Sequence, residues 1–172
     1  MALRLKSIDV NLSMLKGTWE LDAKEAQAAW EIYVDMVTRI PIAPLDPSGG
    51  LVREALDSLY GLFLNCRETL KKYGPDVAKA KGKGSFSLAY ISVWMLNGEI
   101  RPFLSRWHPL LEEYESLRAA GASRKSHDDA WPDRARFRSE LHALGSSLTR
   151  YAEVFGEAAG VPSLIPNPGP EG

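Results

Sequence analysis

The segment that decides the fold runs from Phe86 to Leu117 and reads FSLAYISVWMLNGEIRPFLSRWHPLLEEYESL. Apolar residues recur along it in alternating steps of four and three, and a period of about 3.5 residues is typical of a helix with one buried stripe. The sequence therefore predicts a long amphipathic helix against which the other helices pack. The stripe consists of Ala89, Val93, Leu96, Ile100, Phe103, Trp107, Leu110, Tyr114 and Leu117.

Two prolines, Pro102 and Pro109, fall inside this predicted helix. An interior proline removes one helical hydrogen bond and costs about 3 kcal/mol, so it often ends a helix. The apolar stripe nevertheless stays in register across Pro102. We therefore predict one continuous helix, kinked near Asn97-Gly98 and Pro102, rather than two helices separated by a loop.

The rest of the chain divides into an N-terminal arm and three further helical segments. Residues 2–21 alternate between apolar and polar side chains, which is typical of an extended strand or a hairpin. Apolar stripes of helical period follow in residues 26–40, 52–70 and 137–158. The sequence thus predicts a mainly α protein, an antiparallel four-helix bundle with a short N-terminal β-strand or hairpin arm.

The domain boundaries follow from the same patterns. We expect one helical-bundle domain over residues 1–162, with the arm at 2–21 and the bundle at 22–162. Residues 163–172 are rich in proline and glycine, which predicts a flexible tail.

Composition narrows the class of protein. The chain has 172 residues, a formal charge of −1 and a single cysteine, Cys66. A nearly neutral charge argues against a nucleic-acid surface, and one cysteine excludes an intramolecular disulfide. The first residues lack the apolar core of a secretory signal, and no uncharged run reaches the roughly 18–20 residues of a membrane span. We therefore expect a cytoplasmic protein without a membrane partner, and Cys66 as a core residue.

Polar residues gather near the predicted kink, where a proline leaves backbone carbonyls without partners. The sequence offers them as a site for a small anionic ligand or a nucleotide. In the alternative interpretation the arginines lie along the helices and pair with Glu68 or Glu99. The candidate ligand-binding residues are Arg67, Asn97, Arg101, Arg106 and His108.

A second set of charges lies at two predicted helix ends, where both placements oppose the helix dipole. If the two helices are antiparallel neighbours, these ends meet and the charges can pair across them, or they can await a partner protein. The candidate partner-docking residues are Glu112, Glu113 and Glu115, followed by Arg134, Arg136 and Arg138.

No catalytic residue or metal ligand stands out from the sequence, and we expect no cofactor. His127, Asp128 and Asp129 are adjacent on a loop and do not converge on one ion. The lysines in residues 79–83 lack the pattern of a phosphate-binding P-loop, so they are predicted to be mobile and solvated.

Three stretches resemble small bacterial helical accessory proteins to which no activity is assigned. They are AAWEIYVDMVTR from residue 28, LVREALDSLY from residue 51 and LNGEIRPFLSRWHP from residue 96, and together they span residues 28–109. The resemblance implies a bacterial, cytoplasmic accessory protein of a multi-component system and carries over no site residues.

These observations rank three functions. The first is a non-enzymatic module for protein–protein interaction, with a protein partner or a second copy of the chain bound through the arm and the charged helix ends. The second is binding of a small anionic ligand or nucleotide beside Pro102. The third is a membrane-active helical effector that uses the uncharged run from Phe86 to Leu96.

Overall fold

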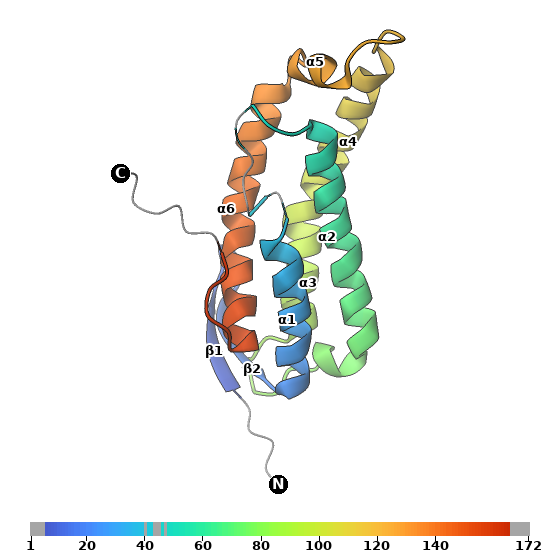
Figure 1. Ribbon diagram of the computed structural model, residues 1–172. Coiled ribbons are helices and arrows are strands. Elements are labelled where there is room, and N and C mark those ends of the chain that lie inside the picture. Colours follow the sequence, from blue (N-terminus) through green and yellow to red (C-terminus); the bar gives the residue numbers. More distant parts are fainter. Residues whose placement is uncertain (1–5, 40, 43–45, 47, 166–172) are drawn as a thin grey trace, which may run out of the picture.

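The computed structural model describes residues 6–39, 41–42, 46 and 48–165. Within these residues the chain is mainly helical and carries a two-stranded antiparallel hairpin near its N-terminus, which confirms the predicted class (Figure 1). Helix α1 (Ala23–Val37) packs against α6 (Arg134–Ala159) and α2 (Val52–Tyr73), and α2 packs against α4 (Arg101–Ser116). The antiparallel four-helix bundle stays a prediction.

The hairpin consists of β1 (Lys6–Asn11) and β2 (Lys16–Leu21). Alternate residues of a strand face the same side, and the inward side carries the buried residues Ile8, Val10 and Trp19. A lone hairpin is marginally stable. Packing of its apolar face against α1 and α6 therefore stabilises it. Residues 2–5 of the predicted arm lie outside the described part of the chain.

A fully buried carboxylate, that of Glu25, connects the hairpin, α1 and the first residue of α3 (Leu88–Trp94). Glu25 accepts hydrogen bonds from Trp19 Nε1 at 3.2 Å and from the amide of Leu88 at 3.0 Å. Lys81 forms an ion pair with it at 3.1 Å, and the Lys81 side chain is only 16% exposed. The expectation that the lysines of residues 79–83 are all mobile and solvated is therefore wrong for Lys81.

The segment that opened the sequence analysis forms one helical run without a loop. Helix α3 (Leu88–Trp94) leads into the π-helix η2 (Met95–Ile100), which leads into α4. The amide of Arg101 donates to the carbonyl of Leu96, five residues earlier, as a π-turn requires. This confirms the continuous helix predicted through Pro102 and Pro109 and shows that its irregularity is a π-turn.

The predicted apolar stripe is correct only in its middle. The π-turn explains the error on the N-terminal side, and on the C-terminal side the 3.6-residue period of α4 brings Leu111 rather than Leu110 to the buried face. A π-turn adds one residue to the α-helical repeat, so the buried face advances by one position across η2. Val93 and Leu110 belong to the predicted stripe but are 45% and 39% exposed. The face that is buried consists of Leu88, Ile91, Met95 and Leu96 before the change of phase, and of Ile100, Phe103, Leu104, Trp107 and Leu111 after it.

The short helix α5 (Arg124–Asp129) joins α4 to α6 at the end of the molecule opposite to the hairpin (Figure 1). Along α6, Gly156 lets α1 approach closely, because a Cβ at this position would lie 3.1 Å from the ring of Tyr33. The hydroxyl of Tyr33 accepts a hydrogen bond from the amide of Leu164 at 2.6 Å. Residues 166–172 of the predicted tail lie outside the described residues.

Candidate functional site

The structure gathers only part of the predicted site at the kink. Arg101 and His108 line a pocket of about 220 Å³, which we call the kink pocket. Asn97 accepts a hydrogen bond from Arg101 Nε at 3.0 Å, and the Arg101 guanidinium lies 5.0 Å from the centroid of the Phe63 ring. Asn97 thus holds Arg101 in place without lining the pocket.

The other two predicted ligand-binding residues lie elsewhere. Arg106 forms an ion pair with Glu140 of α6 at 3.2 Å, and Arg67 is exposed on α2 and does not line the kink pocket. Among the described residues neither Arg101 nor Arg106 forms an ion pair with Glu68 or Glu99, the acids that the alternative interpretation offered. Glu68 pairs with Lys71 instead.

The two predicted charge clusters do not pair with each other in the described part of the chain. Glu115 pairs with Arg53 of α2, and Arg134 pairs with Asp128 at 3.0 Å. Arg136 pairs with Glu140 at 3.2 Å, within its own helix. Arg138 donates to the backbone carbonyls of Asp46 and Gly49, and Glu112 and Glu113 are exposed. Pairing across the ends of the two helices, one of the two alternatives that the sequence left open, is therefore not formed among the described residues.

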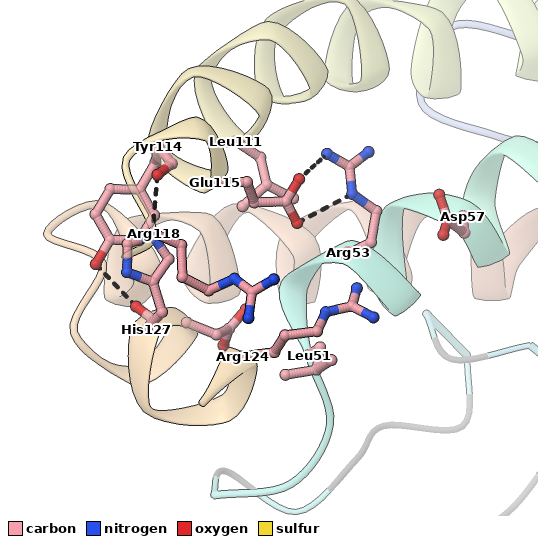
Figure 2. A pocket seen from close by; sticks show the side chains of 10 residues that line it. Leu51, Arg53, Asp57, Leu111, Tyr114, Glu115, Arg118, Arg124 and His127 are labelled. Carbon is pink, nitrogen blue, oxygen red and sulfur yellow. Dashed lines mark hydrogen bonds and ion pairs between the residues drawn. The ribbon is translucent and has the colours of Figure 1, made fainter. Parts of the chain in front are cut away.

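A larger pocket, of about 430 Å³, lies where the C-terminal part of α4 and helix α5 meet the N-terminus of α2 (Figure 2). We call it the arginine pocket, because three arginines line it. Figure 2 shows Arg118 and Arg124 extending toward the space beside Arg53. The full lining consists of Leu51, Arg53, Asp57, Leu111, Tyr114, Glu115, Arg118, Arg124, His127 and Asp128.

Arg53 is held by a two-point ion pair. Its Nε donates to Glu115 Oε1 at 3.2 Å, and its Nη2 donates to Glu115 Oε2. This hydrogen bonding to a carboxylate raises the pKa of Arg53 above its ordinary value, and the nearby charge of Asp57 adds to the effect. The side chains of Arg53 and Glu115 are 26% and 37% exposed, so the pair lies at the solvent boundary of the pocket.

The other two arginines differ from Arg53 in having no carboxylate partner among the described residues. Arg118 Nη1 donates to the carbonyl of Ala122 at 2.7 Å, a neutral acceptor in the turn after α4. Arg124 is exposed in the first turn of α5. The pocket therefore presents two guanidinium groups whose charge no ion pair compensates.

An aromatic pair forms one wall of the pocket. The rings of Tyr114 and His127 are stacked, with their centroids 4.1 Å apart. The Tyr114 hydroxyl donates to the carbonyl of His127 at 2.8 Å, and His127 Nε2 lies 2.9 Å from the carbonyl of Tyr114. Because a carbonyl can only accept, His127 Nε2 carries a proton and donates it here. The reciprocal bonds fix α5 against α4.

Asp128 ties the same helix to α2. This 8%-exposed carboxylate accepts from the amide of Val52 at 2.9 Å and from Arg134 Nε at 3.0 Å. The first amides of a helix have no partner within the helix, so Asp128 caps α2 from a distant part of the chain. The arginine pocket is thus framed by α2, α4 and α5 in a fixed arrangement.

The arginines of the pocket are suited to binding anions. Guanidinium groups bind carboxylates and phosphates through paired hydrogen bonds. Among the described residues no group of three or more His, Cys, Asp and Glu side chains could hold a metal ion. Burial raises the pKa of the Cys66 thiol to about 12, so it is a poor nucleophile in the core. No helix in the described ranges is long and apolar enough to cross a membrane.

Sequence reasoning missed Arg53, Arg118 and Arg124. One signal was available, since Arg53 lies in the first turn of α2, where a cation opposes the helix dipole. Arg118 and Arg124 flank a turn, and only the fold shows that this turn faces the start of α2.

No protein-family model matches the sequence, and neither the curated proteins nor the solved structures give a match.

Proposed function

We propose that the protein is a non-catalytic binding module and that its arginine pocket receives an acidic segment of a partner protein. The observation that carries the proposal is the presence of Arg118 and Arg124, without carboxylate partners among the described residues, beside Arg53. Arginine is favoured at interfaces and pairs with carboxylates at two points. A bacterial, cytoplasmic accessory role agrees with this proposal.

The framing of the pocket supports recognition of a partner without rearrangement. The hydrogen bonds of Asp128 and of the Tyr114–His127 pair hold the backbone on which the arginines stand. Preorganised groups lose less conformational entropy on binding. The volume of about 430 Å³ lies within the range of roughly 300–1,000 Å³ that binding pockets occupy.

The test is binding of a fluorescent hexaglutamate peptide to the full chain, measured by anisotropy. Charge reversal in R118E/R124E is expected to weaken binding by about tenfold or more, because each arginine then repels the ligand. The matched control is R67E/R150E, which changes the net charge equally at exposed positions outside the pocket. Equal weakening by both double variants would show that only net charge matters and would contradict the proposal.

A second candidate function is binding of a small anion in the kink pocket. It is favoured by Arg101 at the pocket wall and by His108 Nε2, which is buried and has no hydrogen-bond partner among the described residues. A thermal-shift screen against nucleotides and phosphate tests it, with Arg101→Ala as the variant. A shift that persists in Arg101→Ala excludes this pocket as the site.

The third candidate, a membrane-active effector, has the least support. The exposed face of α3 offers Tyr90 and Val93, which are 50% and 45% exposed, as its large apolar side chains. Leakage of dye from liposomes tests this function.

A further inference from the structure

We infer that Glu115 is an internal substitute for the partner's carboxylate, which must displace it from Arg53 for full engagement of the arginine pocket. This inference rests on the proposed function and names both the chemical group that is recognised and the contact that opposes it. Glu115 comes from the same chain, but it occupies Arg53 as an acidic side chain of a ligand would.

The first argument is geometric. Of the three arginines that line the pocket, Arg53 alone is paired with a carboxylate in the described residues, and it uses both Nε and Nη2 to make that pair. The two atoms are the edge of the guanidinium that a bound carboxylate would use. While Glu115 holds this edge, an acidic ligand reaches only Arg118 and Arg124 fully.

The second argument concerns how easily the contact opens. The side chains of Arg53 and Glu115 are 26% and 37% exposed, so water can solvate both groups when they separate. Partly exposed ion pairs contribute little to stability because solvent screens them. An incoming carboxylate that also contacts Arg118 and Arg124 can therefore replace Glu115 at small cost.

The third argument is that, in the described residues, Glu115 forms no ion pair with the arginines at the start of α6. The arginines at the start of α6 have other partners, since Arg134 pairs with Asp128 and Arg136 pairs with Glu140. Among the described residues, Glu115 forms an ion pair with Arg53 alone. Its removal therefore frees Arg53 without breaking another ion pair of the fold.

The test uses Glu115→Gln, which removes the charge and keeps the size of the side chain. Its affinity for the hexaglutamate peptide is expected to rise by at least about fivefold over the unaltered chain. Thermal unfolding of the variant, without peptide, shows that it is folded. In the double variant R53Q/E115Q the gain should disappear, because the freed guanidinium is no longer present.

Two controls separate release of Arg53 from a simple change of charge. Asp57→Asn removes a negative charge from the pocket lining but does not break a hydrogen bond to Arg53. Glu113→Gln removes a charge from the exposed side of the same helix. The inference predicts a larger gain for Glu115→Gln than for either control, and an equal gain for Asp57→Asn would overturn it.

The outcomes also distinguish this inference from the proposed function. If the unaltered chain binds the peptide through Arg118 and Arg124 but Glu115→Gln binds no more tightly, the function stands and the inference is wrong. If only Glu115→Gln binds, Glu115 blocks the pocket and the inference is supported. If neither protein binds, both proposals are rejected.

Discussion

The ammonium group of Lys81 forms a 3.1 Å ion pair with Glu25, whose carboxylate is fully buried. Lys81 also donates to the backbone carbonyl of Asp76 at 2.8 Å, so its side chain is held from two directions. The sequence predicts that the loop carrying Lys81 is solvated. The ion pair nevertheless joins this loop to the carboxylate of Glu25, which the hairpin and α3 also contact. This contact leads to the first stability prediction.

Lys81→Met is expected to destabilise the protein by about 3 kcal/mol, because it leaves a buried carboxylate without its counter-charge. Unfolding in urea, followed by circular dichroism, measures the change. Lys83→Met is the matched control, since Lys83 is exposed and forms no ion pair in the described residues. The double variant E25Q/K81M should recover part of the loss, and no recovery would contradict the explanation.

Asp128→Ala is expected to lower the free energy of unfolding by about 1–3 kcal/mol, because the variant loses the cap of α2 and one of the two carboxylate partners of Arg134, the other being Asp129. Asp128→Asn should lose less, since its amide oxygen can still accept from Val52. Asp129→Ala is the control, because Asp129 caps no helix and its side chain is 47% exposed. Equal losses in Asp128→Ala and Asp129→Ala would argue against the capping role.

Deletion of Gly98 is expected to leave a folded protein that unfolds cooperatively. The deletion removes the extra residue of the π-turn, so the buried Met95 and Ile100, now five residues apart, become four residues apart and the faces on either side stay buried. Deletion of Ser105, within the regular part of α4, rotates every later side chain by about 100° and should abolish cooperative unfolding. Calorimetry of the two variants compares them, and failure of both would contradict the explanation.

The free energy of unfolding should decrease as the pH is lowered and His108 becomes protonated. Burial lowers the pKa of His108, and the charge of Arg53 lowers it further. The unfolded chain therefore binds a proton at a higher pH than the folded one, so this stabilisation is present above the unfolded pKa of about 6.5 and is lost below it. Urea unfolding at about pH 7.5 and about pH 5.5 should show a smaller difference for His108→Gln than for the unaltered chain. His142→Gln, an exposed control, should leave that difference unchanged.

Local patterns were sufficient to predict the class of fold. The period of about 3.5 residues between Leu96 and Trp107 predicts a helix that continues through Pro102, and the structure confirms it. The phase of the outer positions could not be predicted. Nothing in the sequence marks the π-turn except a glycine and a proline that are equally consistent with a kink, so Val93 was assigned to the wrong face. Leu110 was misplaced because the predicted step of 3.5 residues is shorter than the 3.6-residue period of α4.

The candidate site was less accessible to prediction, because it depends on contacts between residues that are distant in the sequence. Arg53 meets Glu115, and Asp128 caps α2, only once α2, α4 and α5 are placed together. The sequence identified Glu115 and Arg134 as members of two charge clusters in unfavourable places and offered pairing between the clusters as one of two alternatives. The helix dipole predicts which charges lie at an unfavourable helix end. The partner of such a charge depends on which helices are neighbours in the fold.

The positions of the hairpin and of α5 at opposite ends of the molecule give the protein a direction (Figure 1). A polypeptide joined ahead of β1 would enter far from Arg53, Arg118 and Arg124 and would not cover them. The chain can therefore be tethered by its N-terminal side to a sensor surface, with the arginine pocket pointing into solution. Such an oriented layer would let binding be read without steric interference from the support.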